Sequence, residues 1–512
     1  MLVEQLNKLQ TNKHTMKKFT TIALAASAAT CAWGYTSVSS DVESDVTWTT
    51  AGSPYILEDI IYVKSNAVLT IEPGVIVRGQ PRSATTDPGS LVVTQAGTII
   101  ADGDPNNPII FTTAAIDVND DNIADLDGSD FALYTGTEAF LDADPAASPL
   151  GPVDGNGDSN QSYWGGLVVL GEAPTNVGTS DKAATDNPVP ALHHIEGLAK
   201  TNDTVYGGHK FNDNSGVLRY VSVRHGGDEI GSDNEINGIT LGGVGAGTTI
   251  EYCEVYSTYD DGFEFFGGTV NTNHLVVTYA GDDQFDGDQG WTGINQYWFA
   301  TLPYFPIGKE NGDKCFEFDG DDGFTANKHL TDQSGNFINF ADYTVYNATI
   351  IGADAATENS VPTNGQINLK ANYGGSIYTS YFFEAGVPVI SSVSSKTGAH
   401  LVENTFVSTA TDFVTDVNAA LSSSLVSTNE GNVVSDGTGF LQPLLLGSDQ
   451  TWGGTDTLNP RIGVALSGIT NTVLEQQGAE RNAYRGAFDP DTNVELWTTG
   501  WTVLNTAGVL VD

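Results

Sequence analysis

The chain has 512 residues, 58 of them glycine, and its 64 acidic residues against 20 basic ones give a formal net charge of −44. This charge excludes the dense phosphate contacts on which nucleic-acid binding depends, and it disfavours adsorption to anionic lipid. A single globular core rarely grows to this length, so we expect either two or three domains or a solenoid, which extends in one dimension. The acidity also fits an exported protein that is merely kept soluble by its charge.

The N-terminal region, residues 1–34, has the pattern of an export signal. From Met16 the chain reads MKKFTTIALAASAATCAWG, in which two lysines precede a short apolar run and small residues suited to cleavage. The run is too short to span a bilayer, and no later segment supplies the roughly 18 consecutive apolar residues of a membrane helix. Cys31 could carry a lipid anchor, but the residues before it lack the usual leucine and small residue. The sequence predicts a secreted or outer-surface protein that starts at Met16, without a lipid anchor or transmembrane segment.

Short apolar runs begin after a lead-in at 35–54. They are rich in Val, Ile and Thr and are separated by Gly, Pro, Asn and Asp, which is typical of short strands joined by tight turns. The clearest runs lie at 67–71, 75–79, 91–93, 98–101, 109–111, 164–171, 217–223, 249–255, 274–277 and 343–350. No amphipathic helix of convincing length competes with them. The pattern favours an all-β fold, a parallel β-helix over 55–385 that is interrupted by an acidic insertion at 112–163 and a loop at 174–215. Residues 386–512 should form C-terminal turns and a cap, with the aromatic segment 484–501 covering the last turn.

The strongest repeat is acidic. DDGFEFF at 260–266 and DDQFDGD at 282–288 lie in register 22 residues apart, and FEFD at 316–319 is a third copy. This interval is about one turn of a β-solenoid, so equivalent side chains should stack about 4.8 Å apart. We call these carboxylates the acidic ladder: Asp260, Asp261, Glu264, Asp282, Asp283, Asp286, Asp288, Glu317, Asp319, Asp321 and Asp322. Stacked carboxylates repel, so they must be protonated, splayed into water or bridged by cations, and we expect Ca²⁺.

Two further loops have oxygen ligands at alternate positions, as a short calcium loop requires. The first contains Asp117, Asn119, Asp121 and Asp125, and the second contains Asp154, Asn156 and Asp158. The first is no EF-hand, because its sixth position is Asn122 and its twelfth is Gly128; it is more similar to the acidic loops of dockerin or thrombospondin type 3 repeats. The alternative is that both are solvated acidic loops.

Catalysis is the competing interpretation of the ladder. A calcium-dependent lyase would need a base near the carboxylates, for which Arg224, Lys309 and Lys314 are the candidates in sequence. Asp261 and Asp283 could instead serve as acid and base of a glycosidase. Their Asp-Asp pairs resemble those of polygalacturonases, but the Gly-His-Gly and Arg-x-Lys elements of that family are absent. We expect the two histidines in the ladder turns, His225 and His274, to be satisfied polar residues.

Aromatic residues crowd the segment between the second and third acidic copies: Trp291, Tyr297, Trp298, Phe299, Tyr304 and Phe305. They could stack on sugar rings, contact a protein, or pack against the solenoid. Cys253 and Cys315 could form a disulfide in an exported protein, but their apolar surroundings favour buried free thiols.

Several longer strings carry a resemblance to a known family. They are WGGLVVLG at 164–171, IEG at 195–197, NSGVLRYV at 214–221, DNEINGITLGGV at 233–244, DDGFEFFGGTVN at 260–271 and YRGAF at 484–488. These strings resemble a family of exported bacterial proteins of surface or lipoprotein type, from about residue 55 to the C-terminus. The resemblance implies a right-handed parallel β-helix of the pectin-lyase-like type, and it supplies no activity or catalytic residues.

The sequence thus leads to one expected function and two alternatives. We expect a calcium-stabilised β-helix, secreted or on the cell surface, that binds carbohydrate or a surface protein without catalysis. The first alternative is a polysaccharide lyase or glycoside hydrolase that acts on acidic glycans. The second is a structural component of a surface layer or matrix.

Overall fold

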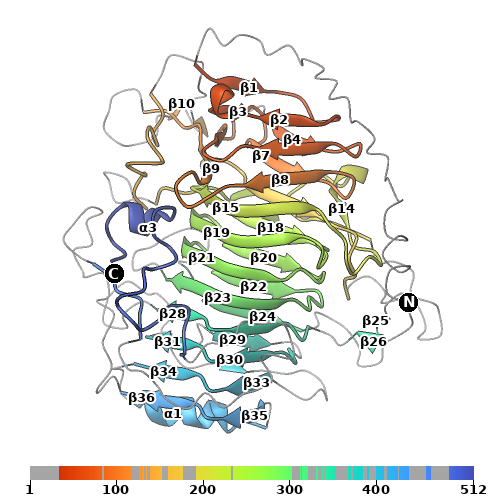
Figure 1. Cartoon of the computed structure of the whole chain (residues 1–512). Helices are drawn as coiled ribbons and strands as arrows, with labels where there is room; N and C mark the ends of the chain where they lie inside the picture. Colours follow the sequence, from red (N-terminus) through yellow and green to blue (C-terminus); the bar gives the residue numbers. More distant parts are fainter. Residues whose placement is uncertain are drawn as a thin grey trace, which may run out of the picture. The chain divides into compact units, whose positions relative to one another are not determined.

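The short apolar runs form strands that stack in parallel, coil upon coil, in the computed structural model (Figure 1). The structure describes residues 34–511 except for 84–85, 118–125, 128–129, 132–133, 135–138, 153–158, 177–191, 232–233, 303–311, 313, 321–329, 332–336, 339–340, 353–366, 371–372, 385–388, 391–398, 409–411, 425, 437–456 and 463–483. The all-β parallel β-helix that the sequence predicts is confirmed.

One face of the helix is a nine-stranded parallel sheet, which we call sheet B. Its strands lie in chain order from one end of the solenoid to the other, so each coil contributes one strand. They are β4 (Ile60–Val63), β7 (Ser90–Val93), β12 (Leu167–Leu170), β18 (Ile239–Gly242), β20 (Phe263–Phe266), β22 (Phe285–Asp288), β24 (Phe316–Asp319), β29 (Ile367–Lys370) and β32 (Val389–Ile390).

The other two faces belong to a 19-stranded sheet, sheet A, in which two parallel ladders are joined. Coils near either end contribute two short strands, whereas in the middle coils one long strand runs through both ladders. The long strands are β15 (Gly216–Arg224), β19 (Thr249–Thr258), β21 (Thr272–Ala280) and β23 (Ile294–Thr301). The short strands are β1 (Thr36–Val38), β2 (Val46–Trp48), β3 (Tyr55–Leu57), β5 (Val68–Ile71), β6 (Ile76–Gly79), β8 (Thr98–Asp102), β9 (Ile109–Thr113), β27 (Thr344–Tyr346), β28 (Thr349–Ile351), β30 (Ser376–Tyr378), β31 (Tyr381–Phe383), β33 (Ala399–Val402), β34 (Thr405–Val407), β35 (Val426–Glu430) and β36 (Val433–Ser435).

Each long strand bends where one residue adopts the left-handed conformation. These residues are Tyr220, Tyr252, His274 and Tyr297, with φ between 47° and 59°. Such angles are uncommon for residues other than glycine. Here the four rings form a column, with centroids of neighbouring rings 4.2 to 4.6 Å apart. Ring stacking therefore accompanies the bend from coil to coil.

Short hairpins and helical segments accompany the coils. Four antiparallel hairpins lie in the described parts of the connecting loops: β10 (Leu126–Asp127) with β11 (Asp130–Phe131), β13 (His193–His194) with β14 (Val205–Tyr206), β16 (Asp228–Gly231) with β17 (Asn234–Ile236), and β25 (Leu330–Thr331) with β26 (Phe337–Ile338). The helical segments are η1 (Thr50–Gly52), η2 (Asn202–Thr204), α1 (Phe413–Leu421) and α3 (Val503–Thr506). In the described part of the chain, no helix combines the length and apolarity needed to cross a membrane.

The β-helix is longer than the 55–385 predicted from the sequence. Its parallel pairing begins at Thr36, which pairs with Tyr55, and continues to Ser435, which pairs with Val407. The coils after 385 are the C-terminal turns predicted for 386–512, whereas the first strands, in the lead-in at 35–54, were not predicted. Backbone pairing needs no particular side chain, and the Thr- and Ser-rich lead-in shows little apolar periodicity. Helix α1 was not predicted either; its Val417 and Leu421 are buried in the main core beside the last coils.

The interior is apolar and rich in stacked aromatic rings. Trp291 lies 3.7 Å from Phe265 between ring centroids, and Trp298 lies 4.1 Å from Phe285. Packing against the solenoid thus accounts for Trp291, Trp298 and Phe299, all fully buried; Tyr304 and Phe305 lie outside the described residues. Cys253 and Cys315 are buried free thiols, as predicted.

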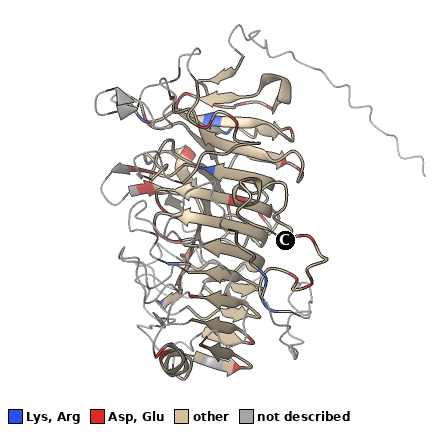
Figure 2. Cartoon of the chain, turned by 90° about the vertical axis from the view of Figure 1, so that its left-hand side faces the viewer, with Lys and Arg blue, Asp and Glu red and all other residues tan. Residues whose placement is uncertain are grey.

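The C-terminal segment 484–511 lies along the flank of sheet A instead of covering the last turn (Figure 1). Trp501 meets Tyr220 of the aromatic column, and the backbone N–H of Val503 donates to the carboxylate of Glu254 at 2.8 Å. The prediction that the aromatic segment 484–501 covers the last turn was wrong, because these side chains pack on the ring column of the flank. Figure 2 views this flank and shows acidic residues spread over it, with few basic ones.

Candidate functional site: the acidic ladder

The acidic ladder lies on sheet B and on the turns that lead into it. Glu264 of β20 pairs with Asp286 of β22, which pairs with Glu317 of β24. These three carboxylates therefore stand on consecutive coils at equivalent positions, as the 22-residue repeat predicts. The interval before Glu317 is longer and contains residues 303–311 and 313, which lie outside the described residues.

The turn residues of the ladder also support the backbone of the next coil. The side-chain oxygen of Asn237 accepts from the backbone N–H of Asp261 at 3.1 Å, and a carboxylate oxygen of Asp261 accepts from the N–H of Asp283 at 2.9 Å. Each side chain thus satisfies a backbone donor one coil further along. Asp261 keeps its second carboxylate oxygen for other contacts.

Three groups of ladder carboxylates converge closely enough to share a cation. In each group one oxygen per residue lies within 4.8 Å of the others. The groups are Asp260 with Asp261 and Asp282, Asp261 with Glu264 and Asp286, and Asp283 with Asp286 and Glu317. We call them the first, second and third carboxylate groups. Because Asp261 and Asp286 each belong to two groups, the three are connected.

Burial makes the second carboxylate group costly to ionise. Glu264 and Asp261 are each only 7% exposed. The pKa values of Asp261, Glu264 and Asp286 all lie well above the usual range, first because burial disfavours the charged form and then because neighbouring carboxylates repel it. Asn237 donates to Glu264, but one oxygen of Asp286 is enclosed without a hydrogen-bond partner.

Two described lysines form ion pairs with the ladder at the end built by β24 and β29, which lie below β20 and β22 in Figure 1. Lys370 of β29 places its ammonium 2.6 Å from Glu317 and 3.3 Å from Asp319, and Lys314 lies 3.2 Å from Glu317. Although burial acts in the opposite sense, these ammonium groups hold the pKa of Glu317 below its usual range. Asn368 adds a hydrogen bond to Glu317 at 3.1 Å.

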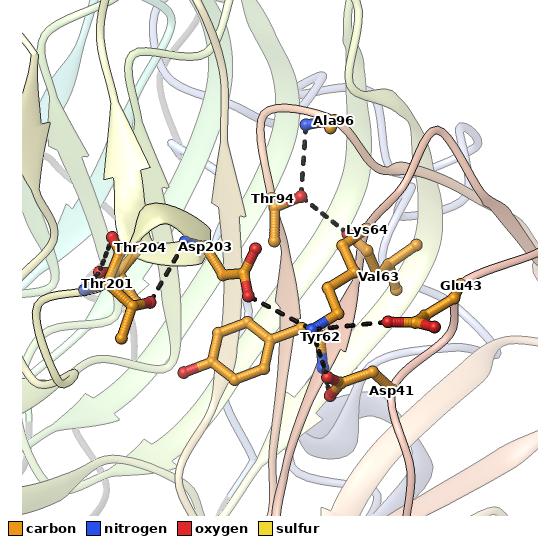
Figure 3. Close-up of polar contacts among 10 residues, drawn as sticks. All are labelled: Asp41, Glu43, Tyr62, Val63, Lys64, Thr94, Ala96, Thr201, Asp203 and Thr204. Carbon is orange, nitrogen blue, oxygen red and sulfur yellow. Dashed lines mark hydrogen bonds and ion pairs between the residues drawn. The ribbon is translucent and has the colours of Figure 1, made fainter.

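The loop segment 192–211 borders the other end of the ladder. Its Tyr206 packs on Phe266 of β20, within an apolar cluster on the outer face of sheet B. Figure 3 shows how the loop is attached to the first coils: the ammonium of Lys64 lies between Asp41, at 2.7 Å, and Asp203, at 3.3 Å. The described loop therefore packs on the outer face of sheet B next to the acidic ladder.

The basic candidate Arg224 is engaged elsewhere. It is buried on β15 in sheet A, where its guanidinium donates to the hydroxyl of Ser222 at 2.7 Å and to the carbonyl of Pro145 at 2.5 Å. Burial lowers the pKa of His225, and it lowers that of His274 to about 3. Both histidines are therefore neutral, and their rings pack on Tyr256 and Tyr252, respectively. The prediction of satisfied polar residues was wrong, because Nε2 of His225 and Nδ1 of His274 are enclosed without a hydrogen-bond partner.

Several candidate residues lie outside the described residues: Asn119, Asp121, Asp125, Asp154, Asn156, Asp158, Lys309, Asp321 and Asp322. Of the first predicted calcium loop, Asp117 is described; it is buried, and its backbone N–H donates to the carbonyl of Ala139 at 3.1 Å. Both calcium loops remain predictions.

Sequence reasoning missed four residues of the site, namely Asn237, Asn368, Lys370 and Glu196, whose charge helps to raise the pKa of Glu264. The signal for two of them was available in principle, because Asn368 and Lys370 pair with Glu317 and Asp319 on the next strand of sheet B. The irregular interval between these strands hid the correspondence. Asn237 carries no acidic group and so fell outside the search for carboxylates.

Comparison with known families agrees with this architecture. A family model described as a pectate-lyase-like β-helix domain matches residues 40–125 and 146–442, which is most of the chain. The chain belongs to the pectate-lyase-like β-helix family. The fold implied by the motif resemblance is thereby confirmed. Searches of curated proteins and of solved structures gave no significant match.

The donor set of the ladder fits a hard divalent cation. Calcium takes six to eight oxygen ligands, many of them from carboxylates. The first and second carboxylate groups together supply carboxylates from Asp260, Asp261, Glu264, Asp282 and Asp286. An enclosed oxygen of Asp286 without a hydrogen-bond partner is one that a bound cation would satisfy. When bound, the cation would supply positive charge that offsets the repulsion within the ladder.

Proposed function

We propose that this pectate-lyase-like protein is a calcium-stabilised, non-catalytic binding module, secreted or on the cell surface, whose ligand is a carbohydrate or a surface protein. The observation that carries the proposal is the second carboxylate group, in which Asp261, Glu264 and Asp286 converge in buried surroundings. Calcium at this position would remove a repulsion that the fold otherwise retains. The export pattern from Met16 supports the location outside the cell.

The ion pairing of the described lysines beside the ladder favours binding over catalysis. Lyase chemistry requires a group that gives up its proton near the operating pH. In the described part of the ladder the basic side chains are Lys314 and Lys370, both in ion pairs with Glu317. Ion pairing with Glu317 and Asp319 raises the pKa of Lys370 despite partial burial, which holds it in the ammonium form. Arg224 is buried in sheet A.

Calcium titration of the purified protein, read by calorimetry and by thermal melting, tests the cation. We expect binding in the wild type and its loss or strong weakening in Asp261→Ala and Asp283→Ala. A site at 100 times its dissociation constant stabilises the folded state by about 2.7 kcal/mol, which melting resolves easily. Binding that is lost only in Asp121→Ala would place the calcium site in the first loop instead of the ladder. If no form of the protein binds calcium, the proposal of a calcium-stabilised protein is refuted.

A second assay tests whether the protein binds acidic polysaccharides without cleaving them. The calcium-loaded protein is incubated with acidic polysaccharides while unsaturated products and new reducing ends are measured, and binding to the same polysaccharides is followed in parallel. We expect retention of an intact polysaccharide or of a cell-surface fraction without product. Product formation that disappears in Lys314→Gln would replace the proposal with a lyase.

A further inference from the structure

The lower end of the ladder differs in chemistry from the rest. Going down sheet B, one row of outward positions reads Glu264, Asp286, Glu317 and then Asn368. In the neighbouring row Asp319 of β24 pairs with Lys370 of β29. The coil that follows the last carboxylates therefore carries an amide and an ammonium where further acids would continue the ladder.

The ammonium of Lys370 is placed among carboxylates much as a bound cation would be. It lies 2.6 Å from Glu317 and 3.3 Å from Asp319, and all three side chains are at least two-thirds buried. Glu317 is a member of the third carboxylate group. In contrast, no Lys or Arg of the described residues forms an ion pair with Asp261, Glu264 or Asp286. Glu317 thus has a positive charge supplied by the described chain itself, whereas Asp261, Glu264 and Asp286 have no such ion pair.

We propose that Lys370 is a built-in cation that neutralises the third carboxylate group, so that this group does not need external calcium. This inference rests on the proposed calcium binding. An ammonium attached to the neighbouring strand is present at high effective concentration and does not dissociate from the protein. A calcium ion entering the third group would meet the repulsion of this ammonium and of Lys314. Lys370 is in this sense the residue that determines how many ions the ladder accepts.

The test compares Lys370→Gln with Lys370→Arg and with the wild type. Calorimetric titration with Ca²⁺ alone gives the number of bound ions, and melting in EDTA and in calcium gives the stability. We expect Lys370→Gln to bind one more ion than the wild type, to melt lower in EDTA and to recover in calcium. Lys370→Arg keeps the charge and should match the wild type in ion number.

A matched control is Lys210→Gln, which removes another lysine that is paired with a glutamate, Glu172, but that glutamate belongs to none of the three carboxylate groups. It should leave the ion number unchanged. An equal ion number in Lys370→Gln and in the wild type overturns the inference while the proposed function stands. A wild type that binds no calcium, with Lys370→Gln also binding none, overturns both.

Folding of the variants is informative in itself. If Lys370→Gln folds only in the presence of calcium, then the external ion replaces the lysine, as the inference requires. If Lys370→Arg also fails to fold without calcium, the lysine acts through its shape rather than its charge, and the inference is overturned.

Discussion

Replacement of Glu264 by glutamine should stabilise the calcium-free protein and weaken its response to calcium. The substitution keeps the shape of the side chain and an oxygen that can accept from Asn237, but it removes one charge from the second carboxylate group. Glu264 faces Asp261 and Asp286 at no more than 4.8 Å between oxygens. At an effective dielectric constant near 20, each fully charged pair at this separation repels by about 3.5 kcal/mol.

The variant gains less free energy than the sum of the two pairwise repulsions, because Asp261, Glu264 and Asp286 in the wild type can retain protons. Their raised pKa values make this possible. We therefore expect Glu264→Gln to gain about 2 to 4 kcal/mol in the free energy of unfolding at pH 8 in EDTA. Chemical denaturation measures the gain, and calorimetry should show weaker calcium binding in the same variant. The matched control is Glu251→Gln on sheet A, whose half-exposed pair with Arg219 is worth about 1 kcal/mol at most.

The prediction rests on opposite effects of the substitution in EDTA and in calcium. The variant should be the more stable form in EDTA and the less responsive form in calcium. A Glu264→Gln protein that is less stable than the wild type in EDTA at pH 8 would refute the reasoning, since Glu264 would then be stabilising as a charged group without any cation.

Three further predictions follow from burial and charge. The difference in the free energy of unfolding between Glu264→Gln and the wild type should grow from pH 5 to pH 8, because the folded wild type retains a proton above the pH at which the unfolded chain releases it. Each retained proton costs the wild type up to about 1.4 kcal/mol per pH unit. A difference that shrinks as the pH rises would contradict the raised pKa of Glu264. Trp501→Ala, which removes a ring that is only 1% exposed, should lower the free energy of unfolding by about 3 to 5 kcal/mol in chemical denaturation. Val494→Ala, at a position that is 44% exposed, should lower it little. Equal losses in the two variants would mean that the C-terminal segment does not pack on the flank. Cys253 and Cys315 should resist a thiol reagent at pH 8 until the protein is unfolded, because burial raises the pKa of Cys253 to about 12 and raises that of Cys315 as well; rapid reaction of the native protein would contradict their enclosure.

The fold and the central part of the ladder were predictable because they depend on local repetition. Runs of β-branched residues between turn residues specify strands, and a 22-residue interval places Asp260 over Asp282 and Glu264 over Asp286 whatever the rest of the chain does. Burial of the two cysteines follows from their place in these runs, whereas the sequence left the aromatic residues near residue 295 open between binding and packing. Local sequence therefore determined the coil, its register and the stacking of carboxylates.

The tertiary structure decided which groups share an environment. Lys370 reaches Glu317 from 53 positions along the chain, while Arg224, much closer in sequence to the first acidic copy, is enclosed in sheet A. The C-terminal segment likewise brings Val503 to Glu254 across 249 positions. The physical reason is that a strand's repeat specifies its neighbours one coil away, whereas the length and path of the excursions between coils determine what covers each face. Burial, charge pairing and the resulting pKa values depend on those coverings, so the sequence placed the carboxylates in a column and only the folded chain determined which of them meet a lysine.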